Sequence, residues 1–386
     1  MFNKSALAVV IASAFALPAH ADIKNVDIYG QIAISAWTGA DWATVDANGG
    51  YENPIKIENE SRIGFRGSKD FANGPKFIWQ IESGNVGESG GDGKLGVRDT
   101  FGGFEWEGIG KVRAGRMLTP LYEVLDWPYS SISTGKVMDW RGDIIGGGNY
   151  DRQSNMIRFD SANHSGFSYN LALGRGNNTN DASSNFYGLG AHYNTGPLTL
   201  HATYEKGTDR KIGEGAFHGT QKLAKIDENN KNTANALLTH TSGTGDSNAY
   251  LLGFELNFDN GLGFYGAYKR LTADYSDMDL NVIGVGTTTL NGMSQDSYTL
   301  ATVYNTGLWQ FKLAYAANLK PEFETAAGDF KASEFSDSII SGQAMYFLDD
   351  SAVAYVRPYY LQRRGLSVVQ DGDKEFGLGM GVEYYF

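Results

Sequence analysis

Apolar and polar residues alternate with a period of two along most of the chain. In the stretch VDIYGQIAIS, for example, Val26, Ile28 and Ile32 share one face and most of the residues between them are polar. The same alternation returns in LTLHATYEK, AYLLGFELNF and WQFKLAYAA. Because successive side chains of a β-strand point to opposite faces of the sheet, this pattern predicts an all-β fold.

Sixteen segments with this pattern can be counted. They cover residues 26–38, 57–70, 75–85, 95–107, 110–117, 152–162, 165–175, 184–195, 197–208, 247–259, 262–275, 293–306, 308–320, 334–348, 351–363 and 373–386. The number is even, as a closed antiparallel bacterial barrel requires.

Short and long connections alternate between the segments. Every second connection is a tight turn, such as FANGP, EGIG, NTGP, DNG or NTG, which joins antiparallel neighbours directly. The long connections cover residues 39–56, 86–94, 118–151, 176–183, 209–246, 276–292, 321–333 and 364–372. Short turns at one end and long loops at the other are typical of outer-membrane barrels. We therefore predict a transmembrane antiparallel β-barrel of about 16 strands; the alternative is a soluble exported protein whose strands cover a core.

The last segment, EFGLGMGVEYYF, shows the same pattern at its clearest. Its apolar face carries Leu378, Met380, Val382, Tyr384 and Phe386. We expect this face to meet lipid, with its aromatic end at the membrane interface. Pairing with the first strand would remove the free sheet edge, which hydrocarbon does not tolerate.

The first residues predict a secretory signal peptide at 1–21. Lys4 supplies the positive charge, an apolar run follows from Ala6 to Leu17, and Ala-His-Ala at 19–21 matches a cleavage site. The run is too short to span a bilayer, which takes about 20 residues. The barrel domain is then 22–386; an N-terminal helix packed on the core is the alternative.

Composition narrows the possible partners. The chain has 386 residues, no Cys and a net charge of −12. Without Lys4, the mature chain carries 31 bases and 44 acids, so its charge is 31 − 44 = −13. With no long basic run, nucleic acid is not an expected partner. With no Cys, disulfides and thiolate metal sites are excluded.

The residues also resemble those of a known family, the Gram-negative trimeric general porins, and especially its neisserial and related proteobacterial branch. The matching stretches are VDIYGQI, SRIGFRGSKDFANGPKFIWQIE, RDTFGGF, GKVRAGR, MIRFDS and the terminal GVEYYF. The resemblance covers the whole mature chain, and residues 61–116 are its most specific part.

This resemblance implies an outer-membrane homotrimer, in contact with lipid and lipopolysaccharide, that passes small hydrophilic solutes by passive diffusion. It implies a third loop folded into the pore and a terminal Phe386 that the assembly machinery recognises. It also suggests that Arg116 receives an acid from a neighbouring subunit, with Glu88 as the candidate. The third loop lacks the Pro-Glu-Phe-Gly run of enterobacterial members, and whether the long loop 209–246 covers the pore stays open.

Arginines gather on the predicted lumen face of neighbouring strands. In SRIGFRG, Ile63 and Phe65 point to lipid, so Arg62 and Arg66 point inward. The same alternation gives six inward arginines, called here the basic wall: Arg62, Arg66, Arg98, Arg113, Arg152 and Arg158. We predict that they line the pore constriction; the alternative is that each pairs with a lumen carboxylate and only stabilises the barrel.

The loop at 118–151 carries the matching acids. These loop acids are Glu123, Asp126, Asp139 and Asp143. A loop of this length without strand signal is usually functional or disordered, and its tryptophans favour packing. Inside the barrel its acids would face the basic wall; an external lid is the alternative. Because the acidic mouths and the basic wall oppose each other, we expect a weak preference for cations.

Other classes of function find little support. His240 and Ser242 form the only His-x-Ser, in a long polar loop without a third catalytic member, and no hydrolase, zinc-protease or phosphate-loop motif occurs. The acids of DYSDMD lack the spacing of a calcium loop. We therefore predict no enzyme activity, cofactor or metal. The closer rival is a sugar-specific channel, in which aromatic rings would stack on pyranose faces. The candidate rings are Trp127, Tyr129 and Trp140 of the loop, with Tyr29, Trp37 and Tyr359 on the lumen side.

Overall fold

The computed structural model describes most of the chain. The described residues are 26–39, 44–45, 51–52, 55–87, 93–131, 134–139, 151–176, 183–212, 243–282, 286–326, 328–331, 336–362 and 374–386. Several residues and segments named in the sequence analysis lie outside them: the signal peptide at 1–21, Glu88, Trp140, Asp143, His240, Ser242 and most of the loop 209–246. None of the helices among the described residues is long and apolar enough to cross a membrane.

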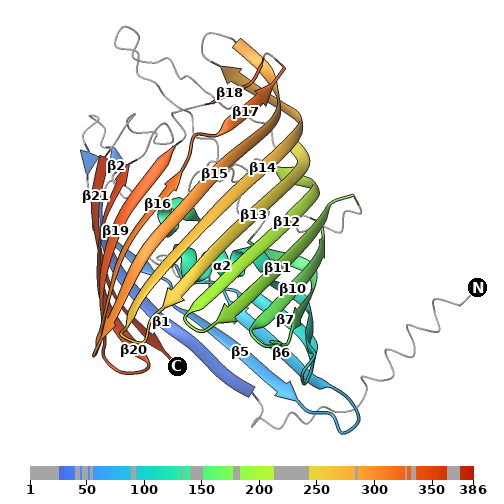
Figure 1. The fold of residues 1–386 in the computed structure, drawn as a ribbon, viewed down its shortest axis with the longest axis vertical. Helices are drawn as coiled ribbons and strands as arrows, with labels where there is room; N and C mark the ends of the chain where they lie inside the picture. The colour runs from blue at the N-terminus through green and yellow to red at the C-terminus, as the bar shows by residue number, and fades with distance from the viewer. Residues whose placement is uncertain are drawn as a thin grey trace, which may run out of the picture.

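The chain forms a closed antiparallel barrel of 16 strands, so the predicted fold class is confirmed (Figure 1). In chain order the barrel strands are β1 (Val26–Thr38), β4 and β5 (Lys56–Asn59 and Arg62–Lys69, one interrupted strand), β6 (Lys76–Ser83), β7 (Leu95–Trp106), β8 (Gly110–Leu118), β9 (Arg152–Ser161), β10 (Phe167–Arg175), β11 (Asn185–Thr195), β12 (Leu198–Ile212), β13 (Gly243–Asn257), β14 (Leu262–Val282), β15 (Gly286–Thr306), β16 (Trp309–Asn318), β19 (Asp337–Phe347), β20 (Ala352–Gln362) and β21 (Lys374–Tyr385).

Pairing between the first and last strands closes the barrel. Strand β1 pairs with β21 over eight positions, from Gln31 opposite Tyr385 to Thr38 opposite Leu378. Two further backbone bonds join Gly30 and Phe386: the Gly30 amide donates to the Phe386 carbonyl at 2.9 Å, and the Phe386 amide donates back at 3.2 Å. Closure leaves no open edge at this seam, as the hydrocarbon phase requires.

Burial alternates along the strands as the sequence predicts. On β13, for example, Leu251 is fully buried whereas Leu252 is 60% exposed. The exposed set is rich in Ile, Leu, Phe and Tyr, among them Ile28, Ile157 and Leu313. An apolar outer face and a polar inner face are the arrangement of a membrane barrel.

The long strands extend beyond their predicted ends where bulges bend them. The register of β12 on β13 shifts between Gly207 and Arg210, and that of β14 on β15 shifts between Asp274 and Met278. A short hairpin, β17 (Glu322–Thr325) with β18 (Phe330–Lys331), pairs onto β15, and β2 (Thr44–Val45) pairs with β3 (Tyr51–Glu52) in a separate sheet. A bulge adds residues to one strand only, which alternation alone does not reveal.

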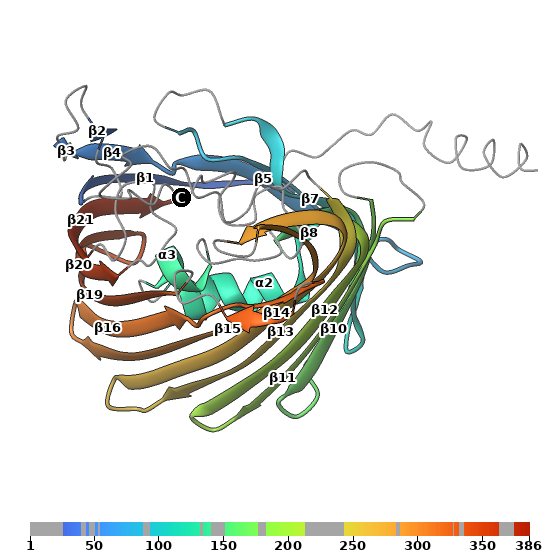
Figure 2. The ribbon, with the colours of Figure 1, turned by 90° about the horizontal axis from the view of Figure 1, so that it is seen from above.

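Three short helical segments follow β8. They are α2 (Pro120–Val124), the π-helical turn η3 (Leu125–Ser130) and α3 (Gly135–Met138). Seen from above, α2 and α3 lie inside the ring of strands (Figure 2). Thr119 caps α2, because its hydroxyl accepts the amide hydrogen of Tyr122 at 3.2 Å.

Candidate functional site

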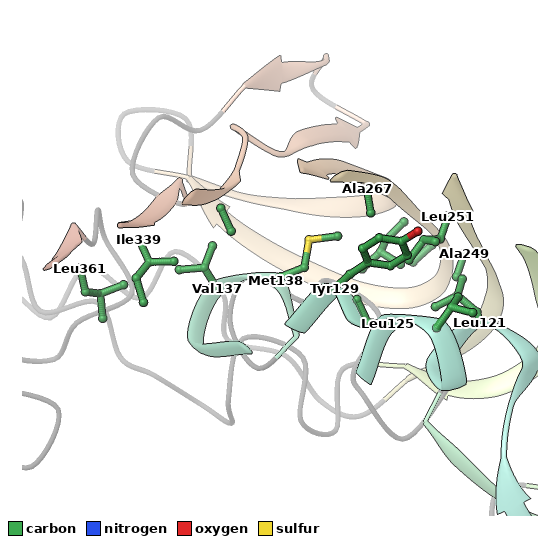
Figure 3. Close-up of a cluster of buried hydrophobic side chains, with 14 of the residues drawn as sticks. Leu121, Leu125, Tyr129, Val137, Met138, Ala249, Leu251, Ala267, Ile339 and Leu361 are labelled. Atoms are coloured by element: carbon green, nitrogen blue, oxygen red, sulfur yellow. The ribbon is translucent and has the colours of Figure 1, made fainter. Parts of the chain in front are cut away.

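An apolar cluster joins the helical segments to the inner barrel wall (Figure 3). The inward residues on β13 and β14, such as Leu251 and Ala267, are small or apolar where the polar face of a lumen would be expected. The helical segments contribute Leu121, Leu125, Tyr129, Val137 and Met138, which meet Ala249, Leu251, Ala267, Ile339 and Leu361 of the strands. Burial of these side chains therefore holds residues 119–131 and 134–139 against one side of the barrel.

Polar contacts hold the same segment at both ends. The buried carboxylate of Glu205 accepts the backbone amide hydrogen of Leu121 at 2.7 Å. The buried ammonium of Lys269 donates to the carbonyl oxygen of Met138 at 2.5 Å. Strand side chains thus satisfy backbone groups that short helices leave without an internal partner.

A cavity of about 500 Å³ lies between this segment and the opposite part of the lumen. From the segment, Asp126, Trp127 and Asp139 face it. Residues of β1, β4, β5, β16 and β19–β21 close the other sides, among them Trp37, Glu58, Glu60, Arg62, Lys312, Gln343, Tyr355, Arg357, Tyr359 and Glu383. Aromatic rings and charges of both signs therefore line the same water-accessible space.

Two arginines of the basic wall share one carboxylate. Glu82 on β6 lies 3.4 Å from the Nε of Arg62 and 2.5 Å from the Nε of Arg98. Its second oxygen accepts the hydroxyl of Tyr29 at 2.8 Å. Of the basic wall, only Arg62 lines the cavity.

A second carboxylate, that of Asp160 on β9, pairs with two further arginines of the basic wall. Its oxygens lie 2.7 Å from the Nη2 atoms of both Arg113 and Arg158. Arg158 also bonds the carboxylate of Glu123 and the carbonyl oxygen of Leu118, and only 2% of its side chain is exposed. This contact with Glu123 is the one ion pair between the basic wall and the loop acids in the described part of the chain.

The two remaining arginines have partners of their own. Arg152 lies 2.6 Å from Asp99, and Arg66 lies 2.7 Å from Asp27 in a pair that is more than half exposed. All six arginines of the basic wall are therefore ion-paired, which is the arrangement that the alternative interpretation expected.

Two local irregularities break the alternation from which inward positions were counted. The register of β6 on β7 shifts between Ile81 and Ser83. Phe101 was expected on the outer face, which is the opposite face to that of Arg98. Its ring centre instead lies 5.0 Å from the guanidinium of inward Arg113. On β9, Asn155 has a φ of 53°, and three steps of two from Arg158 do not account for Arg152. The step count that led to Arg152 is therefore interrupted by this irregularity, Arg152 pairs with Asp99, and its place at the constriction stays a prediction.

Asp139 lies at the edge of the cavity and is only 8% exposed. It accepts the hydroxyl hydrogen of Tyr122 at 3.0 Å. Burial raises the pKa of Asp139 to about 7, and nearby Lys269 and the bond from Tyr122 oppose this rise. Asp139 therefore changes charge near neutral pH, unlike an ordinary surface aspartate.

Comparison with known proteins places this barrel in a family. A family model described as Gram-negative porin matches residues 6–365. The chain belongs to the Gram-negative porin family. The chitoporin of Vibrio furnissii is 34% identical over 380 residues, which cover 94% of this chain and 91% of that protein. The major outer membrane protein P.IB of Neisseria meningitidis serogroup B is 29% identical over 204 residues, 50% of this chain and 56% of that protein.

Solved porins share the fold. The anion-selective porin from Comamonas acidovorans superposes with a TM-score of 0.65 at 18% identity, over 94% of this chain and 99% of that one. OmpT of Vibrio cholerae superposes with a TM-score of 0.63 at 14% identity, over 94% and 97% of the two chains. Family and fold together make this porin an outer-membrane channel.

The predicted trimer residue Arg116 lies on β8 of the porin. Its guanidinium donates to the carbonyl oxygens of Val97 at 2.7 Å and Arg152 at 3.3 Å, and to the hydroxyl of Ser154 at 3.1 Å. Among the described residues it has no carboxylate within 4.0 Å.

Sequence reasoning missed two cations of the porin lumen, Lys312 and Arg357. Both line the cavity, and neither has a carboxylate within 4.0 Å in the described ranges. The alternation in WQFKLAYAA does place Lys312 on the polar face, but a single cation in one strand gives no clustering signal. No group of three or more His, Asp or Glu in the described residues could hold a metal ion.

Proposed function

We propose that this porin passes small hydrophilic solutes and ions passively through the cavity, which is its constriction. The observation that supports this is the packing of residues 119–131 and 134–139 against the inner barrel wall, which leaves a cavity of about 500 Å³ lined by Asp126, Trp127 and strands that include β16 and β19–β21. The channel acts without chemistry on its solutes, and no catalytic residue or cofactor is assigned.

Planar-bilayer recording of the purified protein tests this function. We expect stepwise conductance in KCl and permeation of small neutral sugars in liposome-swelling assays. Deleting residues 126–139 should increase the single-channel conductance, because the segment that narrows the lumen is removed. An unchanged conductance in a variant that still assembles would contradict the proposed constriction.

Charges around the cavity set the ion preference in this proposal. Asp126 and Asp139 stand on the loop side. The wall side carries both signs, with Arg62, Lys312 and Arg357 beside Glu58, Glu60 and Glu383. Charges that face each other across a narrow space are screened less than charges at the mouths. Of the basic wall and the loop acids, Arg62, Asp126 and Asp139 are proposed to act on the solute directly, because they line the cavity. The paired arginines and Glu123 are proposed to act at the constriction mainly by holding the strands and the loop in position.

The porin is further proposed to be a homotrimer. Arg116 has no carboxylate of the described residues within 4.0 Å, and in the trimer it would bind an acid such as Glu88 of another subunit. Insertion in triplet conductance steps and a heat-modifiable oligomer on gels are expected. Independent steps of a single size would contradict the trimer.

The terminal residue is proposed to act in assembly. The backbone of Phe386 pairs with Gly30, while its ring is 47% exposed and lies 6.1 Å from that of Tyr384. An exposed ring at the barrel end suits recognition by the assembly machinery and contact with outer-membrane lipid. Phe386→Ser should lower the amount of assembled barrel at unchanged export; normal amounts would refute this role.

A sugar-specific channel is the second candidate. Trp37, Trp127 and Tyr359 line the cavity, and the rings of Trp37 and Tyr359 lie 6.2 Å apart. Of the other rings considered for stacking, Tyr129 is fully buried against the barrel wall. The similarity to a chitoporin supports this candidate. Saturable block of the KCl current by a chitin oligosaccharide would favour it over general diffusion.

A further inference from the structure

Three polar side chains form a row across consecutive strands on the cavity wall. Lys312 on β16 stands opposite Gln343 on β19 in the strand register, and the Nε of Arg357 on β20 donates to the Oε1 of Gln343 at 3.0 Å. All three side chains line the cavity. The row therefore presents two cations to the solute path, joined by one amide.

Neither cation forms an ion pair with a described residue, although Glu383 attracts both from farther away. Within the described ranges no carboxylate lies within 4.0 Å of either, and Lys312 is only 9% exposed. A buried ammonium normally has a partner, since burying an unpaired charge costs free energy. The six arginines of the basic wall, by contrast, are all paired. With no described carboxylate within 4.0 Å, the ammonium of Lys312 and the guanidinium of Arg357 keep donors for an anion from solution.

Aromatic rings stand beside each cation. The Nζ of Lys312 lies 5.7 Å from the ring centre of Trp127, and the Cζ of Arg357 lies 5.6 Å from that of Trp37. Trp127 is 67% exposed, so its face is open to a ligand. Exposed tryptophan faces stack on flat rings and on the apolar faces of pyranoses.

Acids line the same cavity as the two cations. Glu60 and Glu383 face it, as do Asp126 and Asp139. These acids would repel a small multivalent anion, but they accept hydrogen bonds from hydroxyl groups. A ligand that suits the whole cavity therefore carries one carboxylate, a ring and several hydroxyls.

We infer that Lys312, Gln343 and Arg357, with Trp127 and Trp37, form a binding site for sugar acids such as hexuronates. The carboxylate binds the two cations, the ring stacks on tryptophan, and the hydroxyls donate to the facing acids. Charge-assisted bonds to a carboxylate are stronger than neutral ones, so the site discriminates acidic from neutral sugars. This inference rests on the proposed channel function and names one solute class for it.

Current block by glucuronate in planar bilayers tests the site. The full-length wild-type porin is first recorded in KCl, which tests the channel itself. Glucuronate should then block the current saturably, whereas glucose, which lacks the carboxylate, and acetate, which lacks the ring, should block weakly at equal concentration. Lys312→Gln and Arg357→Gln should each raise the half-blocking concentration of glucuronate about tenfold.

Two further variants make the test specific. Lys76→Gln removes one positive charge from an exposed pair with Glu105 outside the cavity, and should leave the block unchanged. Trp127→Leu should reduce the preference for glucuronate over acetate. Because Trp127 is exposed, we expect this variant to assemble like the wild type, which gel mobility checks.

The pattern of current block supports or contradicts the proposed sugar-acid site. Equal block by glucose or by acetate would overturn the sugar-acid assignment, as would a glucuronate block that survives both cation substitutions. A wild-type protein that conducts KCl without any glucuronate block would overturn the site and leave the channel standing. Assembled protein that does not conduct at all would overturn the proposed function, and the site with it.

Discussion

Two walls of the same lumen carry cationic side chains. On one wall the cations are ion-paired, and on the other they have no described carboxylate within 4.0 Å. On β5–β9, arginines share carboxylates: Glu82 takes two and Asp160 takes two. On β16 and β20, Lys312 and Arg357 face the cavity with no described carboxylate within 4.0 Å. A count of charged residues would rank the first wall higher, although most of its charge is locally compensated.

Pairing separates structural from permeation roles. A paired arginine and carboxylate act on a distant ion as a dipole, whose field falls off faster than that of a single charge. The same pair holds strands and loop together, as Arg158 does for β9 and the segment that carries Glu123. We interpret the β5–β9 wall mainly as a structural support and the β16–β20 wall as the part that solutes encounter.

Substituting a buried arginine of the β5–β9 wall should have the largest effect, which is a loss of thermodynamic stability. Arg158→Gln leaves Asp160 and Glu123 with less compensation in a site where the arginine is 2% exposed. Breaking one partner of a buried pair costs about 3 to 5 kcal/mol. We therefore expect a clearly lower unfolding midpoint in detergent, measured by circular dichroism and gel mobility.

The matched variant lies on the other wall. Lys312→Gln removes a buried charge without a described carboxylate partner, so its free energy of unfolding should stay within about 1 kcal/mol of wild type or rise. If both substitutions destabilised the porin equally, the distinction between the two walls would fail.

Ion selectivity gives the next largest effect. Removing both members of a pair, Arg152→Gln with Asp99→Asn, removes only a dipole, because the two groups lie 2.6 Å apart. Lys312→Gln removes a whole charge from the cavity wall. At a few Å such a charge acts on an ion by about 1 to 4 kcal/mol, depending on the local dielectric.

We therefore expect the reversal potential in a KCl gradient to move towards cations in Lys312→Gln and to change little in the double variant. A larger shift in the double variant would mean that the β5–β9 wall, and not the β16–β20 wall, sets the selectivity.

A smaller effect is expected from pH. Asp139 has a pKa raised to about 7, above its unfolded value of 3.8, so the folded protein binds a proton more tightly than the unfolded chain. Its contribution to stability therefore improves as pH falls from about 7 towards 4, where the unfolded aspartate also protonates. Over the same range the cavity loses one negative charge, and selectivity should move towards anions.

Asp139→Asn isolates this group from others that titrate in the same range. The variant at pH 8 should resemble wild type at pH 5.5 in reversal potential, and its own pH response should be weaker. If wild type and variant responded to pH in parallel, Asp139 would not be the titrating group.

Much of this architecture could be predicted from the sequence, because it depends on local rules. Alternation and tight turns gave the strand order, and the first barrel strand is found at Val26–Thr38, the range predicted. The family resemblance is confirmed by the porin model that matches residues 6–365. These features need only neighbours in sequence to be seen.

Which charged side chains form ion pairs could not be predicted in this way. Whether Arg113 or Lys312 is compensated depends on partners from other strands, such as Asp160, which the register brings close. Bulges near Asn155 also shift which side chains point inward. The clustered arginines could therefore be recognised in the sequence. That Lys312 and Arg357 lie together on the cavity wall can be seen only in the three-dimensional structure.

The smallest effect comes from the exposed member of the basic wall. Arg66 lies 2.7 Å from Asp27, but both side chains are more than half exposed. Such pairs contribute about 0.2 to 1 kcal/mol and weaken as salt rises. Arg66→Gln and Asp27→Asn, singly and together, should give a coupling free energy within this range that declines between 0.1 and 1 M KCl, where the Debye length falls from about 10 to 3 Å. Selectivity should hardly change, because Arg66 lies outside the lining of the cavity. A coupling as large as that of Arg158 with Asp160 would show that burial does not separate these pairs, and the structural role of the β5–β9 wall would then extend to its exposed end.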